Sequence, residues 1–319
     1  MRVIQAHTFG GPEVLKPVDV PEPEPGPGEA VVAVAAADTL FVETQIRTGW
    51  GKEYFDPPLP FTPGGAVSGT VLRVGEGVDR SRLGRRVVAH TGSFGGYAEQ
   101  VTVAATGLIP VPDGVDLDTA AALTHDGPTA LGLFEGAGVR PGETVLVLAA
   151  AGGAGQLLVQ LAHAAGAYVV GAARGEGKLA AVRAHGADRV VDYSRPGWTD
   201  GIAADVVFDG VGGELGRQAL DATADGARFR AYGAPSGDFS VTAPTEDAAR
   251  RGVTVTGIFD ILPAGSSVDD YTARALAEAA AGRLRPMIAE RMPLEQAAGA
   301  HATIEARTAV GKILLVPAA

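Results

Sequence analysis

The chain of 319 residues contains no cysteine. This absence excludes disulfides, thiolate nucleophiles and cysteine-ligated metal sites together. The six histidines are scattered and show no tight ligand spacing. The sequence therefore predicts that the protein binds no metal.

Lysine and long apolar runs are also scarce. Lysine occurs only four times, and the formal net charge is −11, which argues against nucleic acid or an anionic membrane surface as partner. The chain has no apolar run approaching the ~18 residues of a membrane span. Its beginning, MRVIQAHTFGG, lacks a signal-peptide pattern. We therefore expect a cytoplasmic protein with no membrane partner.

The chain is long enough for two domains, and its character changes near residue 121. Residues 1–120 consist of short β segments separated by glycine and proline, typical of an antiparallel barrel or sandwich. From 121 onward, strands alternate with helices, which predicts βαβ crossovers and a parallel sheet. The final strand, GKILLV at 311–316, has no adjacent helix, so we expect it to return to the first domain.

A glycine-rich turn follows a strand of apolar residues at 144–156, TVLVLAAAGGAGQ. It gives A-x-G-x-x-G, with Ala150 at the first position, between a strand and a helix. The amides at such a helix start can bind the pyrophosphate of a dinucleotide. The predicted cradle comprises Gly152, Gly153, Ala154 and Gly155. A tight strand-to-helix turn without a ligand is the alternative.

Basic residues end the second strand of this unit. Arg174 stands at its tip and Lys178 follows four residues later, while Glu176 lies past the position of an NAD-binding acid. Cations near a helix start are unfavourable unless an anion compensates them. The 2′-phosphate of NADPH supplies such an anion, so we predict NADPH. A solvated basic turn is the alternative.

Several longer stretches resemble one protein family. They include FTPGGAVSGTVLRVGEGV at 61–78, GRRVVAH at 84–90, GGYAEQ at 95–100 and AAAGGAGQLLVQLA at 149–162. Together with the beginning and end of the chain, they resemble the zinc-free quinone oxidoreductase (zeta-crystallin-like) branch of the medium-chain dehydrogenase/reductase superfamily.

The resemblance implies an α/β architecture with two domains. A GroES-like β-barrel domain would be formed by residues 1–120 plus 260–319. A Rossmann-type doubly wound parallel sheet, at 121–259, would be inserted as the NADP-binding domain. Zinc-dependent relatives carry an early catalytic cysteine and a Gly-His-Glu segment. This chain has Gly64, Gly65 and Ala66 instead, so the resemblance implies a zinc-independent enzyme.

The resemblance also places further residues around the cofactor. Thr129 would lie near its pyrophosphate or nicotinamide, and Tyr193 would join Lys178 at the 2′-phosphate. The loops around the nicotinamide half would be formed by Val211, Tyr232, Gly233 and Ser236, and Arg307 would reach back to the cofactor. Strand packing is the alternative role for Tyr232, and a surface helix end is the alternative for Arg307.

The substrate side departs from the family pattern. Family members commonly carry Asn and Tyr where this chain has Leu40 and Gln45, so no catalytic acid can be carried over. By position and aromatic character, the pocket candidates are Leu40, Gln45, Trp50, Tyr54 and Phe55. Core or lid packing is their alternative role.

An apolar slot suits a small hydrophobic quinone, because hydride addition gives an anion that aromatises and takes protons from water. The first alternative is NADPH-dependent reduction of an activated C=C bond in an enone or enoyl thioester, which needs a placed proton donor. The second alternative is an NADPH-binding protein without turnover. The β-branched run VTVTGIF at 253–259 predicts an edge strand that pairs across the axis of a homodimer.

Overall fold

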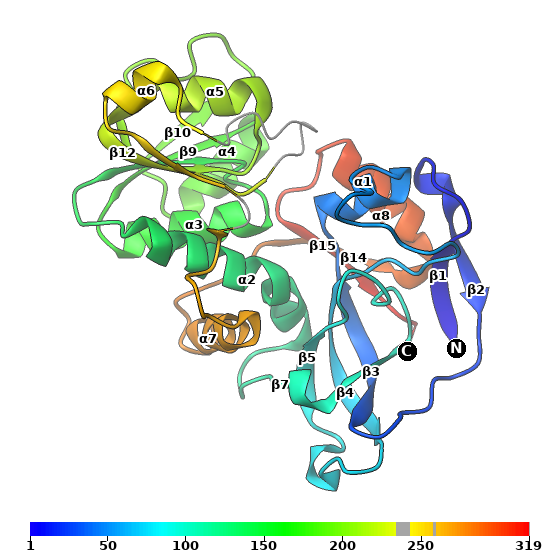
Figure 1. Ribbon diagram of the computed structural model, residues 1–319. Helices are drawn as coiled ribbons and strands as arrows, with labels where there is room; N and C mark the ends of the chain where they lie inside the picture. Colours follow the sequence, from blue (N-terminus) through cyan, green and yellow to red (C-terminus); the bar gives the residue numbers. More distant parts are fainter. Residues whose placement is uncertain (234–242, 258–259, 319) are drawn as a thin grey trace. The chain divides into compact units, whose positions relative to one another are not determined.

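The computed structural model describes residues 1–233, 243–257 and 260–318 (Figure 1). Its contacts group the chain into two compact units. The β-rich unit comprises Met1–His125, Thr272–Gly282 and Ile288–Ala319, and the parallel-sheet unit comprises Asp126–Tyr271 and Arg283–Met287. The units therefore divide at 125/126, 271/272, 282/283 and 287/288, whereas the predicted boundaries are 120/121 and 259/260. A single helix crosses the first division, which is why composition alone places it a few residues early.

A seven-stranded sheet forms the β-rich unit, with the order β14-β15-β3-β4-β5-β7, and β6 also pairs with β3. Its strands are β3 (Glu29–Asp38), β4 (Ala66–Val74), β5 (Arg86–His90), β6 (Gln100–Ala104), β7 (Ile109–Pro110), β14 (Ile288–Pro293) and β15 (Lys312–Val316). A separate hairpin pairs β1 (Arg2–Ala6) with β2 (Leu15–Asp19). The predicted return of the last strand is confirmed, because β15 pairs antiparallel with β3 and parallel with β14.

Three α-helices lie wholly or largely in the β-rich unit. They are α1 (Phe41–Thr48), α7 (Val268–Ala280) and α8 (Ala297–Glu305). Short 3₁₀ turns complete the unit: η1 (Pro12–Val14), η2 (Arg80–Arg82), η3 (Ala105–Gly107) and η5 (Leu294–Gln296). Helix α1 follows β3 directly and begins after Leu40. The segment that carries the predicted pocket candidates thus directly follows a central strand of the sheet.

The parallel-sheet unit contains six strands in the order β10-β9-β8-β11-β12-β13, and every pair is parallel. They are β8 (Thr144–Leu148), β9 (Tyr168–Ala173), β10 (Arg189–Asp192), β11 (Ala204–Asp209), β12 (Thr223–Ala231) and β13 (Thr254–Thr256). Its helices are α3 (Gly153–Ala164), α4 (Glu176–Ala184), α5 (Gly213–Asp221) and α6 (Glu246–Arg250). This strand order is that of a dinucleotide-binding fold, whose ligands bind at the carboxyl ends beside the order reversal between β8 and β11. The predicted doubly wound sheet is confirmed.

Helix α2 (Leu117–Ala137) contains Pro128. Proline has no N–H, so the carbonyl of Thr124 loses its partner within the helix. The hydroxyl of Thr272 donates to that carbonyl at 3.4 Å. At its far end, the carbonyls of α2 accept hydrogen bonds from Arg228 and Arg230, two side chains of β12.

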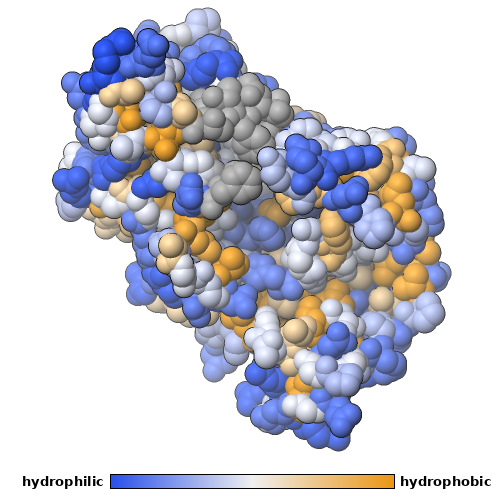
Figure 2. All heavy atoms as spheres, viewed as in Figure 1, coloured by the Kyte–Doolittle hydropathy of each residue, from blue (hydrophilic) through white to orange (hydrophobic). Residues whose placement is uncertain are grey.

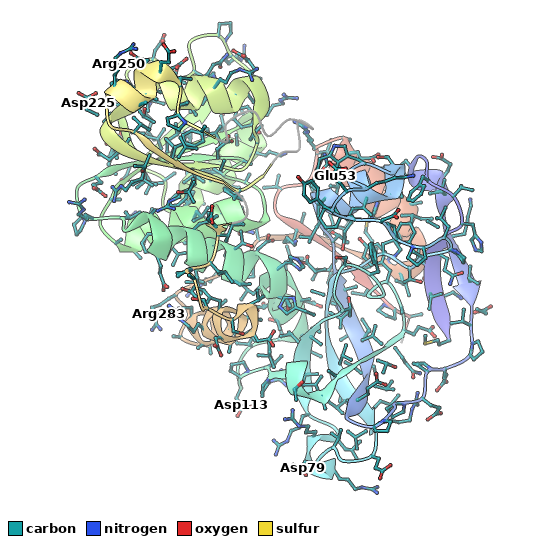
Figure 3. All side chains as sticks on the ribbon, viewed as in Figure 1. Glu53, Asp79, Asp113, Asp225, Arg250 and Arg283 are labelled. Carbon is teal, nitrogen blue, oxygen red and sulfur yellow. The ribbon has the colours of Figure 1, made fainter. Side chains whose placement is uncertain are left out.

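The charged side chains labelled in Figure 3, among them Asp79, Asp225 and Arg250, point away from the ribbon. The surface formed by α6 is strongly hydrophilic (Figure 2), in agreement with its sequence EDAAR. No helix among the described residues is both long and apolar enough to cross a membrane.

Candidate cofactor and substrate sites

The glycine-rich turn lies at the carboxyl end of β8. Ala149 leaves the strand with φ of 51°, and Gly152 is the N-cap of α3. A Cβ built on Gly155 would lie 2.3 Å from the carbonyl oxygen of Ala149. The first turn of α3 therefore packs against the end of the strand in a way that only glycine permits.

The start of α3 fits a pyrophosphate. Gly152 has no side-chain oxygen to cap the amides of the first turn, which comprises Gly153, Ala154 and Gly155. Such uncapped amides and the positive end of the helix dipole attract an anion. The four predicted cradle residues thus occupy the positions at which a pyrophosphate would be held.

The predicted 2′-phosphate residues gather at the ends of β9 and β10. Arg174 directly follows β9 and is exposed, while Lys178 is half-buried in α4. The amide of Tyr193 donates to the carbonyl of Ala173 at 3.3 Å. Two neighbouring strands therefore bring Arg174 and Tyr193 to the same edge of the sheet, and Lys178 lies in the first turn of the following helix.

Asp192 belongs to this turn and was not predicted. Its carboxylate accepts hydrogen bonds from the hydroxyl of Ser194 at 2.6 Å, the amide of Ser194 at 2.9 Å and the amide of Gly175 at 3.3 Å. The bond from the Ser194 side chain is the main reason that the pKa of Asp192 is lowered. The carboxylate thus stabilises the turn that carries Arg174. The aspartate two residues before a serine at a strand end is the sequence signal for such a turn.

Asp209 orders the loop after β11, and its role was also missed. It is buried, and its Oδ1 accepts from the amides of Val211 at 2.8 Å and Gly212 at 3.0 Å. Burial raises the pKa of this carboxyl group. Val211, predicted near the nicotinamide, is itself buried in the parallel-sheet unit. The loop is therefore rigidly attached to the end of β11.

Tyr232 and Gly233 directly follow β12, beside the same loop. A Cβ on Gly210 would lie 2.5 Å from the Tyr232 hydroxyl oxygen, and a Cβ on Gly233 would lie 2.8 Å from the carbonyl oxygen of Gly210. Burial raises the pKa of Tyr232. The close approach of the two strand ends explains both glycines. The predicted Ser236 lies outside the described residues.

Thr129 is half-buried on α2, and Arg307 is exposed. Arg307 has φ of 56°, which is unusual for a residue with a side chain. Its guanidinium group lies 5.6 Å from the ring centroid of Phe41, the first residue of α1. Within the β-rich unit, Arg307 therefore lies against the first residue of α1.

The structure places the five pocket candidates on one segment but gives them different surroundings. Leu40, Gln45 and Trp50 are half-buried, and the amide of Trp50 donates to the carbonyl of Gln45 at 3.2 Å. Tyr54 is 60% exposed, whereas Phe55 packs against the core of the β-rich unit. This packing favours the structural alternative for Phe55.

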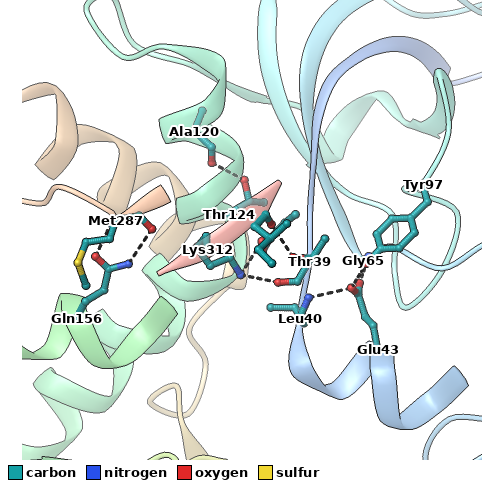
Figure 4. A network of polar contacts seen from close by, with 12 residues as sticks. Thr39, Leu40, Glu43, Gly65, Tyr97, Ala120, Thr124, Gln156, Met287 and Lys312 are labelled. Atoms are coloured by element: carbon teal, nitrogen blue, oxygen red, sulfur yellow. Dashed lines mark hydrogen bonds and ion pairs between the residues drawn. The ribbon is translucent and has the colours of Figure 1, made fainter. Parts of the chain in front are cut away.

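A buried network of polar side chains holds the start of α1 in place (Figure 4). Glu43 accepts hydrogen bonds from the Tyr97 hydroxyl at 2.7 Å, the Leu40 amide at 2.9 Å and the Gly65 amide at 3.0 Å. Glu43 is 4% exposed, and burial raises its pKa. The carboxyl group thus joins α1 to two loops that are distant in the sequence.

The network continues behind Tyr97. The Nε2 atom of His301 lies 3.0 Å from the Tyr97 hydroxyl, and its Nδ1 lies 3.4 Å from the guanidinium group of Arg47. Arg47 is 1% exposed and also pairs with Glu305. Because an arginine can only donate, His301 Nδ1 accepts and Nε2 donates to Tyr97. The hydrogen bonds from Arg47 to His301, from His301 to Tyr97 and from Tyr97 to Glu43 therefore all run in one direction.

Among the residues that the structure describes, no three His, Asp or Glu side chains are arranged to hold a metal ion. A buried ion pair does occur near α1. Lys312 Nζ lies 2.6 Å from Asp38 Oδ1 and donates to the Thr39 carbonyl at 2.9 Å. These contacts connect β15 to the end of β3, immediately before Leu40.

Comparison with known proteins matches two parts of the chain to protein families. Residues 26–113 match the alcohol dehydrogenase GroES-like domain, and residues 185–315 match the domain described as zinc-binding dehydrogenase. The quinone oxidoreductase of Pseudomonas aeruginosa is 33% identical over 98% of this chain and 99% of its own length. The 2-haloacrylate reductase of a Burkholderia species is 31% identical over 98% of both.

A solved structure agrees with these relatives. The quinone oxidoreductase of Escherichia coli complexed with NADPH has a TM-score of 0.85 to this chain and is 27% identical, with 99% of this chain and 100% of the other covered. The chain therefore belongs to the quinone oxidoreductase branch of the medium-chain dehydrogenase/reductase superfamily.

Proposed function

We propose that this oxidoreductase transfers hydride from NADPH to a small hydrophobic quinone without zinc. The observation that carries the proposal is the uncapped glycine cradle of Gly152–Gly155 beside the basic strand end at Arg174. Its relatives include quinone oxidoreductases, one of them solved with NADPH. The absence of cysteine removes the thiolate ligand of a zinc-alcohol mechanism.

The residues of the parallel-sheet unit would bind and orient the cofactor. The amides at the start of α3 hold its pyrophosphate, and Arg174, Lys178 and Tyr193 bind its 2′-phosphate. The loops at Val211 and Tyr232 position the nicotinamide half. When bound, NADPH supplies the hydride.

The β-rich unit would bind the acceptor and exclude water from it. Leu40, Gln45 and Trp50 are the candidates for lining the acceptor site, since they are half-buried on the segment held by Glu43. Protons reach the quinol from water, so the chain needs no strong acid of its own.

The second candidate function is reduction of an activated C=C bond. It is favoured by the relative named 2-haloacrylate reductase. In this reaction the hydride adds to carbon and the resulting enolate is protonated on carbon. Tyr54, at 60% exposed, is the only tyrosine among the pocket candidates that could serve as donor.

A panel of three acceptors separates the candidates. NADPH oxidation would be followed with a naphthoquinone, an alkenal and crotonyl-CoA. We expect the quinone to give the highest kcat/KM. Turnover of only the alkenal or thioester would overturn the quinone assignment in favour of the second candidate. NADPH binding without oxidation by any of the three would mean that the chain has lost turnover.

We also propose that the protein is a cytoplasmic homodimer. The three residues of β13 form one edge of the parallel sheet, where Thr254 is exposed. An open strand edge of this kind can pair with a second copy.

A further inference from the structure

Helix α1 has a buried face that carries charge, since two of its four buried residues are Glu43 and Arg47. These side chains are 4% and 1% exposed, and residues four apart share one face of an α-helix. Replacement of buried charged groups by apolar side chains of similar volume is often neutral or stabilising. The need for a stable fold alone therefore does not account for the two charges on this face.

The two charged side chains fix α1 at both of its ends. Glu43 accepts a hydrogen bond from the amide of Leu40, which directly precedes the helix, at 2.9 Å. In the last turn, Nε of Arg47 donates to the Gly10 carbonyl at 3.1 Å, and the Gly10 amide donates to the Arg47 carbonyl at 3.1 Å. Apolar contacts have no direction, whereas such a hydrogen-bonded network is rigid. The network therefore gives α1 one rotation and one position along its axis.

The loop that precedes β4 is attached to the same carboxylate. A Cβ on Gly64 would lie 2.6 Å from Cδ1 of Tyr97, so the bare backbone of this loop packs directly on the tyrosine ring. The amide of Gly65 donates to Oε1 of Glu43 at 3.0 Å, and the amide of Leu40 donates to Oε2. One side chain thus sets the distance between this loop and the start of α1.

The opposite side of α1 carries one of the pocket candidates. Gln45 lies two residues from both Glu43 and Arg47, so its side chain leaves the helix on the opposite face. Gln45 and Leu40 are both half-buried. A rotation of α1 would therefore move the Gln45 side chain, and release of the Leu40 amide would move the other candidate.

We propose that Glu43 is a positioning residue for the acceptor substrate, a quinone or an enone. This inference rests on the proposed function. Because Glu43 is buried, it acts through the backbone amides of Leu40 and Gly65 rather than by contact with the acceptor. It holds the start of α1 and the neighbouring loop in the one arrangement that orients the acceptor for hydride addition. A misplacement of about 1 Å caused far from the chemistry can lower a rate about 10²-fold.

The first variant is Glu43→Gln, which has nearly the same shape but only one side-chain oxygen. When that oxygen accepts from Leu40 and Tyr97, the amide nitrogen faces the amide of Gly65, and two donors cannot bond to each other. The reverse orientation releases the other two donors instead. At a temperature at which circular dichroism shows the variant to be folded, we expect kcat with 1,4-naphthoquinone to fall about 10- to 100-fold. The affinity for NADPH should be unchanged, because its predicted cradle belongs to the parallel-sheet unit.

Two further variants separate positioning from stability. Tyr97→Phe removes the hydroxyl but leaves both backbone amides bound to Glu43, so kcat should fall less than in Glu43→Gln. Val103 is a buried residue of β6 that pairs with Ala30, at the end of β3 away from α1. Val103→Ala should lower the melting temperature and leave the quinone kinetics unchanged. A wild-type kcat in Glu43→Gln, or a kcat that follows the melting temperature across the three variants, would overturn the proposal.

Acceptor binding gives a readout that does not need turnover. If the wild-type protein turned over none of the three acceptors of the panel, the proposed function would be refuted. The affinity for 1,4-naphthoquinone, measured by isothermal titration without NADPH, would then decide the role of Glu43. We expect Glu43→Gln to bind the quinone about tenfold more weakly than wild type and Val103→Ala to match wild type. Equal affinity in all three proteins would overturn the positioning role.

Discussion

Gly155 shows at the scale of one residue what the sequence predicts and what it leaves out. The A-x-G-x-x-G spacing predicts a turn between strand and helix, and the structure supplies the reason for its last glycine, the Ala149 carbonyl at 2.3 Å from a Cβ. The roles of Asp192 and Asp209 could not be predicted in the same way. Each depends on contacts made only after folding.

Substitution of Gly155 by Ala should destabilise the protein by about 1–3 kcal/mol and weaken NADPH binding, because strand and helix must separate. Thermal unfolding and NADPH titration would measure both effects. Gly177→Ala is the matched control, since nothing lies within 4 Å of its Cβ position in α4. That variant should be neutral or slightly stabilising, and equal effects in the two variants would contradict the packing explanation.

Replacement of both Arg174 and Lys178 by Ala should raise the KM for NADPH far more than the KM for NADH. Two charge-assisted contacts, discounted for solvent, account for a preference of about a hundredfold. Steady-state kinetics with both cofactors would measure it. Equal losses for NADPH and NADH would remove the 2′-phosphate assignment, and Arg217→Ala, on a different helix, serves as the control.

At the scale of the element, helix α1 illustrates the limit of prediction from sequence. The sequence shows that this segment follows a strand and that Leu40 and Gln45 differ from the residues common in the family. The network that holds it, from Arg47 through His301 and Tyr97 to Glu43, joins residues up to 254 positions apart. Such pairing has no local signal, so only the fold reveals it.

Removing the Tyr97 hydroxyl should therefore loosen α1. Tyr97→Phe removes one hydrogen bond from the buried Glu43 carboxyl group and the only described partner of His301 Nε2, at an expected cost of about 1–3 kcal/mol of unfolding free energy. Urea unfolding would measure it. Tyr168→Phe, at a residue 46% exposed, should change stability by less than about 0.5 kcal/mol. Similar small changes in both variants would mean that the network contributes little.

The same network predicts a dependence on pH. Burial, followed by Arg47, lowers the pKa of His301 to about 3 from the usual 6.5. Below pH 6.5, His301 therefore binds a proton in the unfolded chain but stays neutral in the folded protein. The free energy of unfolding consequently decreases as the pH falls from 6.5 toward 3. Between pH 7.5 and 5, this residue should account for a loss of about 2 kcal/mol. Unfolding of His301→Gln at both pH values should show a correspondingly smaller loss, and an unchanged slope would contradict the assignment.

At the scale of the whole molecule, the two-unit architecture follows from the change of rhythm along the chain. The parallel sheet and the return of the last strand to the β-rich unit agree with what the sequence predicts. The composition cannot fix where the contacts divide, because α2 continues across that point.

The proposed dimer belongs to this scale. Light scattering should give a mass near twice 32.3 kDa. A lysine on the exposed edge, Thr254→Lys, should shift the protein toward monomer, because a charge on an edge strand opposes pairing. Leu72→Lys, at an exposed position of the β-rich unit, should leave the mass unchanged. A monomeric wild-type protein would contradict the proposal.

The central claim is hydride transfer from NADPH to a quinone without zinc. The most direct measurement is NADPH oxidation by 1,4-naphthoquinone after the enzyme has been depleted of metal with a chelator, with identification of the quinol. We predict that the rate is unchanged by depletion and that NADPH is strongly preferred over NADH. A rate that disappears on depletion and returns with added zinc, or no quinol formation at all, would contradict the account.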